Sequence, residues 1–264
     1  MTRECNNGWI INTLLQHPEA RLDCEIERWI TVSSEQTSIH VSATYPLPPM
    51  TPFFIELVSR TDEARRSFET NPKVLDIVAK GLPLERYRRL LCELYHVVWH
   101  FNPISAAAAS RMSDQHRDIR YYLYEHMHDE AGHEQWVLND LEAMGVSRAG
   151  AMDYQPTHWL LGMIGYNYWS AERRHPCCAL GMIYALEVVA SVYGGPITTA
   201  IKESLFLEGD RGVTFISSHS TLDAEHMARL RDVLNPIDDP ATREAIVEST
   251  VFNYHQFTRV LENV

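Results

Sequence analysis

The sequence predicts an all-α protein of about seven helices. From residue 51 onward, apolar residues recur at intervals of three and four, which is the spacing of one face of an α-helix. The gaps between these segments hold Pro, Gly and Asn residues of the kind that begin or end helices. The sequence shows no set of alternating segments from which a central sheet could form.

The predicted helical segments can be placed in order along the chain. An Asn71–Pro72 pair marks a helix start, and Gly145 marks a helix end. Pro103 is expected to break or bend one helix, and Pro196 to open a new one after the Gly194–Gly195 pair. Nine segments result when short helices and the two parts of the helix around Pro103 are counted separately: 53–68, 71–81, 83–101, 104–112, 118–145, 175–195, 196–207, 212–234 and 241–264.

The first fifty residues differ from the rest. β-Branched residues alternate roughly over 31–44, and a Pro cluster follows at 46–49. We therefore expect residues 1–50 to form a short extended or irregular arm outside one helical domain of residues 51–264. With 264 residues, 45% of them hydrophobic, the chain is long enough to bury a single large core.

The composition excludes several classes of protein. A net charge of −12 and the absence of a basic run argue against a nucleic-acid-binding protein. Five cysteines, an odd number without a CxxC pair, favour a reducing compartment. The N-terminal apolar run is short and interrupted, and we expect no apolar stretch that approaches a membrane span. We therefore expect a cytoplasmic protein without a membrane partner.

Histidines and carboxylates on three predicted helices form the ligand inventory of a two-iron site. Within each helix their spacing of three or four residues places them on one face, so that facing helices can bring them together. Iron and manganese accept both imidazole and carboxylate ligands, and carboxylates can bridge two ions. The predicted ligands are Glu130, His133, Glu187, His219, Asp223 and His226.

Glu187 is individually the most informative of these residues. It lies among Leu and Val with no Lys or Arg within one helical turn, so without a metal it would be an unpaired buried charge. Glu93 is a further predicted ligand, with His96 as the alternative at this position. His100 and His126 are candidates for residues that orient a ligand.

These motifs, in this order, resemble those of the haem-oxygenase-like diiron oxidases and oxygenases. The resemblance covers about residues 53–235 and rests on Asp129-Glu130 with His133 close behind, the isolated Glu187, and the final His-x3-Asp-x2-His. It implies a haem-oxygenase-like bundle related in fold to thiaminase-type proteins. Glu130 matches the bridging-type carboxylate of that family, and Glu93 matches an early Glu found in some members.

The resemblance also implies a reaction class. The resemblance implies an O2-activating oxidoreductase of specialised metabolism. An enzyme of this kind would N-oxygenate, desaturate or cleave a small amino-acid-like or fatty-acid-like substrate. We expect two Fe(II) ions that bind O2 as a peroxo-diferric species, with Glu130, Glu187 and Asp223 as the catalytic carboxylates. An external electron donor, a reductase partner and a homodimer are further expectations.

Two other functions compete with this interpretation. Glu93–His96 and Glu130–His133 are both Glu-x-x-His pairs, as in ferritin-like bundles that bind or store iron. The second competing function is a metal-free enzyme of the thiaminase type, which would make the ligand set a coincidence. Iron content after anaerobic loading distinguishes the metal-free enzyme from the other two.

Overall fold

The computed structural model describes residues 52–264, apart from the side chains of residues 220–225. Over these residues the chain forms eleven α-helices and no strand, which confirms the predicted all-α fold. The predicted arm, residues 1–50, lies outside the described residues. The helices are α3 (Phe53–Arg60), α4 (Asp62–Glu69), α5 (Pro72–Lys80), α6 (Leu84–Arg111), α7 (Arg117–Asp129), α8 (His133–Ala143), α9 (Arg148–Met152), α10 (His158–Trp169), α11 (Cys178–Leu205), α12 (Thr214–Leu234) and α13 (Pro240–Asn263).

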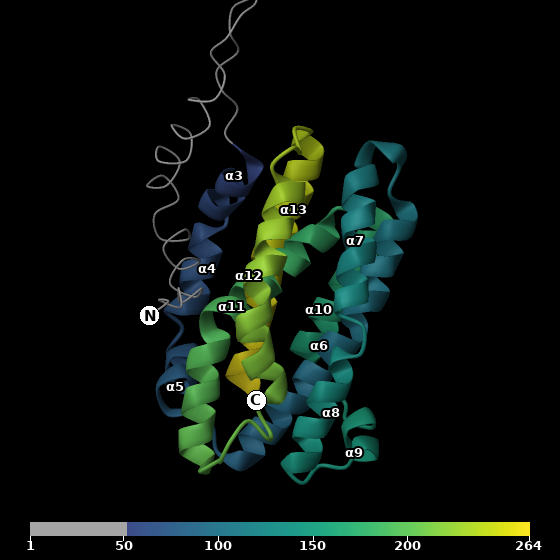
Figure 1. Cartoon of the computed structure of the whole chain (residues 1–264). Helices are drawn as coiled ribbons and strands as arrows, with labels where there is room; N and C mark the ends of the chain where they lie inside the picture. The colour runs from purple at the N-terminus through teal and green to yellow at the C-terminus, as the bar shows by residue number, and fades with distance from the viewer. Residues whose placement is uncertain (1–51) are drawn as a thin grey trace, which may run out of the picture.

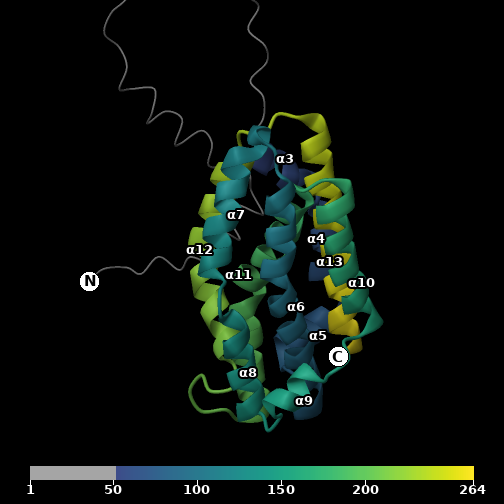
Figure 2. The ribbon, with the colours of Figure 1, turned by 90° about the vertical axis from the view of Figure 1, so that its right-hand side faces the viewer.

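The long helices pack lengthwise into an elongated bundle around α11. Helix α11 packs against α12 and α13, and also contacts α5 and α6. The N-terminal helices α3, α4 and α5 run along one side of α13 (Figure 1). Helices α7 and α8 follow one another end to end beside α12 and α6 (Figure 2). The four helices α6, α7, α11 and α12 thus surround the middle of the bundle.

Helix α11 is long and apolar enough to cross a membrane by length and composition, contrary to the expectation from the sequence. However, 67% of its most apolar stretch is buried inside the protein, as in a core helix. Gly181 allows α13 to pack closely, because a Cβ atom at this position would lie 2.4 Å from the carbonyl oxygen of Ile246. The apolar composition of α11 is therefore explained by its central place in the bundle.

Proline and capping residues begin two helices, one of them at the expected Asn71–Pro72 pair. The side chain of Asn71 accepts hydrogen bonds from the backbone N–H groups of Lys73 and Val74, with Pro72 at the first helical position. Asp239 caps α13 in the same way, and Pro240 follows it. In both helices the cap satisfies backbone N–H groups that have no partner within the helix.

The predicted helix start at Pro196 is wrong, and of the two outcomes expected at Pro103, a break or a bend, the structure excludes the break. Each proline lies inside a continuous helix of 28 residues, α6 and α11 respectively. A proline removes only one backbone hydrogen bond from the helix. Buried residues on both sides of each proline, such as Phe101 and Ile104, hold the two halves of the helix in the core and offset that loss.

The predicted helix over 118–145 is two helices, because the chain turns at Gly132. Gly132 has a φ of 95°, in the left-handed region that a residue with a Cβ atom rarely adopts. Helix α7 ends at Asp129, Glu130 is its C-terminal cap residue, and α8 begins at His133. Glu130 and His133 are therefore brought together by a turn and not by a shared helical face.

Candidate metal centre

Glu130 supplies a carboxylate to two groups of potential metal ligands. Its side chain lies at the end of α7, and the residue is only 9% exposed. The first group is His126, Glu130, Glu187 and His226, and the second is Glu130, His133 and His219. Within each group the potential ligand atoms all lie within 4.8 Å of one another. The arrangement offers two adjacent positions for a cation with one shared carboxylate.

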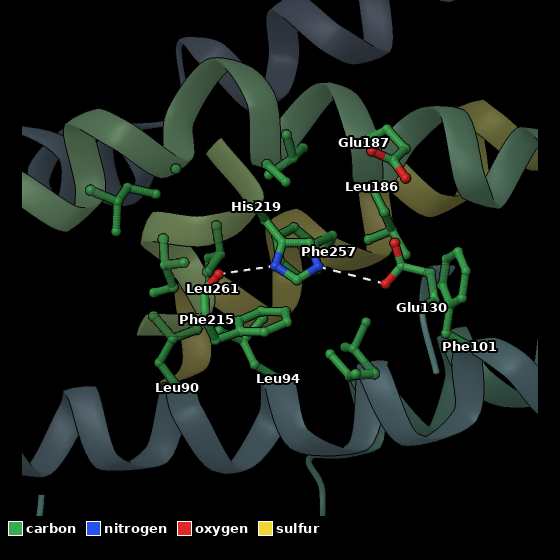
Figure 3. Close-up of a pocket in the computed structure, with 17 residues that line it drawn as sticks. Leu90, Leu94, Phe101, Glu130, Leu186, Glu187, Phe215, His219, Phe257 and Leu261 are labelled. Carbon is green, nitrogen blue, oxygen red and sulfur yellow. Dashed lines mark hydrogen bonds and ion pairs between the residues drawn. The ribbon is translucent and has the colours of Figure 1, made fainter. Parts of the chain in front are cut away.

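The second group joins the turn after α7 to helix α12. Nδ1 of His133 lies 2.7 Å from Oε2 of Glu130, and Nε2 of His219 lies 3.6 Å from the same oxygen. Nδ1 of His219 donates a hydrogen bond of 2.9 Å to the backbone carbonyl of Phe215 (Figure 3). Because a carbonyl oxygen only accepts, this bond places a proton on Nδ1 and leaves Nε2, on the side of Glu130, as the nitrogen that could bind a metal.

The first group joins α7, α11 and α12. Nδ1 of His226 lies 3.3 Å from Oε1 of Glu187 and 3.5 Å from Oε1 of Glu130. Nε2 of His126 lies 3.4 Å from the same oxygen of Glu187. In Figure 3, Glu130 and Glu187 lie toward the same end of the pocket, away from Leu90 and Leu261. This group places two imidazoles and two carboxylates around one point.

Asp140 fixes the start of the helix that contributes both His219 and His226. Its carboxylate, only 1% exposed, accepts hydrogen bonds from the backbone N–H groups of Gly212, Thr214 and Phe215. Because Asp140 belongs to α8, these bonds tie the first turn of α12 to the helix that begins with His133. The two helices of the second group are thereby held in a fixed relation.

The electrostatics of the cluster suit a bound cation. Burial tends to raise the pKa of Glu130, but the adjacent imidazoles of His133 and His219 outweigh this effect and hold the pKa of Glu130 well below its usual value. Burial lowers the pKa of His126 to about 4, so its ring is neutral near pH 7. Neutral imidazoles and ionised carboxylates are the forms in which these side chains bind metals.

Several contacts in the cluster are too long or too poorly directed for hydrogen bonds, yet they suit ligands around an ion. Atoms that bind one ion at about 2.1 Å lie about 3 to 3.5 Å apart in a tetrahedral arrangement. Three buried ring nitrogens have no hydrogen-bond partner in the described part of the chain. They are both ring nitrogens of His126 and Nδ1 of His226. Buried nitrogens of this kind are expected where a metal completes the site.

The structure brings together five of the seven ligands predicted from the sequence. They are Glu130, His133, Glu187, His219 and His226. The side chain of Asp223 lies outside the described residues, although its backbone belongs to α12. His126, predicted only to orient a ligand, has a ring nitrogen among the potential ligand atoms of the first group. The signal that could have identified it is its position four residues before Glu130, one helical turn away.

Glu93 does not join either group, contrary to its predicted role as a ligand. The residue is fully buried, and its carboxylate accepts hydrogen bonds from the hydroxyl of Tyr154 and from both the backbone N–H and the hydroxyl of Thr157. Thr157 is the cap residue of α10, so Glu93 anchors the start of that helix to α6. Its alternative, His96, instead contacts the backbone carbonyl of Tyr154 at 3.2 Å.

An apolar pocket reaches the cluster between α6, α11, α12 and α13. Its polar lining residues in the described part of the chain are Glu130, Glu187 and His219, which belong to the two ligand groups. The remaining lining is mainly aliphatic and aromatic, including Leu90, Phe101 and further residues drawn in Figure 3. From Leu90 to Phe101 the α6 wall extends over roughly 16 Å, at the rise of an α-helix.

Comparisons with solved structures place the fold. A domain of unknown function with a haem-oxygenase-like fold from Shewanella denitrificans is 23% identical, with a TM-score of 0.70 over 80% of this chain and 90% of that one. A TenA homologue from Pseudomonas syringae is 16% identical, with a TM-score of 0.67 over 80% and 92%. A Synechocystis haem oxygenase in complex with haem is 14% identical, with a TM-score of 0.64 over 81% and 92%.

These structural similarities confirm the predicted haem-oxygenase-like fold and, at such low identity, only the fold. A search of curated protein sequences found no significant match. The family model described as iron-containing redox enzyme matches residues 88–251, which include both ligand groups. This match covers more than half of the chain. The chain therefore belongs to the family of iron-containing redox enzymes and is an oxidoreductase by that membership.

Proposed function

We propose that the protein is a non-haem diiron oxygenase or oxidase that uses O2 to oxidise a small substrate with an apolar chain. The observation that supports this proposal most directly is the place of Glu130 in both ligand groups. A shared carboxylate allows two ions to be bound side by side while it offsets part of their combined charge. The mixture of imidazole and carboxylate suits iron, in agreement with the family of the chain.

In this proposal each side chain has a defined role. Glu130 would contribute a carboxylate to both ions, His133 and His219 would hold one of them, and Glu187 and His226 would hold the other. Asp223 is a further carboxylate ligand and, with Glu130 and Glu187, one of the catalytic carboxylates predicted from the sequence. Iron bound here would supply electrons for the reduction of O2, and an external donor would supply the electrons that the substrate does not.

The pocket supports one of the two substrate classes that the sequence left open. A substrate with charged groups along its length would lose their hydration inside the pocket without gaining partners, because the charged or basic lining residues described are ligands of the cluster. An extended aliphatic chain would gain burial along the α6 wall. The pocket therefore favours a fatty-acid-like substrate over a polar amino acid.

Anaerobic titration with Fe(II) tests the proposed cofactor. We expect two irons per chain in the wild type and fewer in Glu187→Ala. Glu125→Ala, at an exposed position of α7, is the matched control and should leave the stoichiometry unchanged. A stoichiometry below one iron, unaffected by Glu187→Ala, would contradict the proposal and favour the metal-free enzyme of the thiaminase type.

Oxygen consumption by the iron-loaded protein tests the proposed reaction. We expect consumption, in the presence of a reductant, to rise on addition of saturated fatty acids and much less on addition of amino acids. Oxidation of many irons per chain, independent of any organic substrate, would instead identify an iron-storage protein. An equal response to both substrate classes would contradict the proposed selectivity while leaving the diiron centre standing.

A further inference from the structure

His126 occupies a position that is costly for a histidine with a purely structural role. It is 1% exposed, and both ring nitrogens lack hydrogen bonds to any described residue. A polar ring buried in this way destabilises the fold, and an apolar side chain of similar size would avoid the cost. Packing of the core therefore does not explain why this residue is a histidine.

The ring is held in place by aromatic neighbours that leave one edge facing the ligand cluster. Tyr122 stacks on it with ring centroids 5.4 Å apart and an interplanar angle of 16°, and Phe101 contacts it at 5.5 Å. Its Nε2 atom lies 3.4 Å from Oε1 of Glu187, and its ring lies 4.9 Å from that of His226. The neighbours thus fix the ring in an orientation that a ligand would need.

From this geometry we infer that His126 is itself a metal ligand, at the ion position formed by Glu130, Glu187 and His226. The inference rests on the proposed function and extends it, because it adds an imidazole to the ligands assigned above. Metal binding would satisfy a nitrogen that has no hydrogen bond in the described structure.

The competing role is a hydrogen bond from His126 that orients the carboxylate of Glu187 without contact to the metal. Two substitutions separate these roles. His126→Gln keeps an N–H donor near Glu187 but removes the imidazole, whereas His126→Leu removes both. If His126 is a ligand, both variants lose it, and one of the two ions should bind at least tenfold more weakly in each. A positioning hydrogen bond would be rescued by glutamine.

Nuclear magnetic resonance of the wild-type protein observes the proposed bond directly. Histidine labelled with 15N is incorporated, and Zn(II) is added as a diamagnetic stand-in for Fe(II). We expect one ring nitrogen of His126, assigned by its absence in His126→Gln, to move to the metal-bound range. His128, exposed on the same helix, should not shift and serves as the control. If other histidines shift and His126 does not, the inference is overturned and the metal centre remains.

The stability of the metal-free protein provides a second readout. Because His126→Leu removes two buried nitrogens without hydrogen bonds, its melting temperature without metal should equal or exceed that of the wild type. A lower melting temperature combined with unchanged Fe(II) binding would identify a packing role and overturn the inference. A wild-type protein that binds neither Zn(II) nor Fe(II) would overturn the proposed function as well.

Discussion

Nδ1 of His133 lies 2.7 Å from Oε2 of Glu130 across the turn at Gly132 that separates α7 from α8. The turn depends on the left-handed backbone of Gly132, whose φ is 95°. A Cβ atom here would meet nothing within 4 Å, so the difficulty for any other residue is the backbone conformation alone. The local backbone at one glycine thus positions two of the proposed iron ligands.

Gly132→Ala should therefore destabilise the protein by about 1 to 2 kcal/mol, the cost of holding a residue with a Cβ atom in a left-handed conformation. It should also weaken Fe(II) binding, because relief of the strain moves His133 away from Glu130. Gly165→Ala is the matched control, since Gly165 lies inside α10 on the surface with open space around it. This control should be neutral or slightly stabilising. Chemical denaturation and Fe(II) titration measure the two effects, and equal results for both variants would contradict the prediction.

Because Glu130 belongs to both ligand groups, its loss should affect two ions, whereas the loss of His133 should affect only one. Glu130→Ala removes a ligand from both groups, so both ions should bind much more weakly. His133→Ala removes a ligand from the second group only and should leave one tightly bound iron. Titration with Fe(II) under anaerobic conditions distinguishes the outcomes. Identical losses in the two variants would mean that the groups do not act as separate ion positions.

The break at Gly132 also explains why the sequence predicted the proximity of Glu130 and His133 for the wrong physical reason. A spacing of three residues predicted that Glu130 and His133 share a helical face, whereas the structure joins them by a turn. The apolar pattern continues across the turn, because both helices pack on α6. Periodicity reports which residues are buried, but it does not report a local change in φ. The Ala131-Gly132 pair between these two residues is the feature of the sequence that indicates a turn.

The structure places Glu93 outside both ligand groups for a related reason. Its apolar neighbours on α6 correctly indicated burial, and a buried carboxylate needs compensation. A sequence alone does not reveal whether a metal or hydrogen-bond donors provide that compensation. Here the donors come from Tyr154 and Thr157, more than sixty positions away in the chain. The overall fold was predictable because helix periodicity is local, whereas this contact depends on tertiary packing.

Glu93→Ala should destabilise the fold without changing the metal stoichiometry. The substitution leaves the hydroxyl of Tyr154 and the backbone N–H of Thr157 without their acceptor, at a cost of about 2 to 4 kcal/mol. Glu93→Gln retains an acceptor oxygen and should cost less. Denaturation curves and Fe(II) titration of both variants measure the two properties. A loss of one iron in Glu93→Gln at nearly unchanged stability would restore Glu93 as a ligand.

The buried cysteines should be unreactive in the native protein. Burial raises the pKa of the Cys92 thiol to about 11 and that of Cys177 to about 12, and it also raises the pKa of Cys178. At pH 8, below these pKa values, the reactive thiolate is a very small fraction of each group. Mass spectrometry after treatment with iodoacetamide should find these three residues unmodified until denaturant is added. Rapid modification of Cys92 in the native protein would show that its surroundings open readily.

A substitution in the apolar pocket should weaken substrate binding without changing metal binding. Ala190 lines the pocket on α11 but belongs to neither ligand group. Ala190→Phe should fill part of the pocket and weaken the binding of a long-chain fatty acid about tenfold or more, at an overpacking cost of about 1 to 3 kcal/mol. Fe(II) binding should remain at the wild-type stoichiometry. Isothermal titration of the iron-loaded protein, kept anaerobic, with fatty acids of increasing length measures the effect.

Leu161→Phe, at an exposed position of α10, provides the control for the added ring. Affinity in this control and in the wild type should increase with chain length until the apolar wall is covered, because each buried methylene contributes about 0.8 kcal/mol. In Ala190→Phe the increase should stop at a shorter chain, since the new ring occupies part of the same path. A parallel loss of affinity at every chain length would instead indicate that the ring disturbs the site near the ligands. Unchanged binding of all chain lengths would exclude this pocket as the place where the substrate binds.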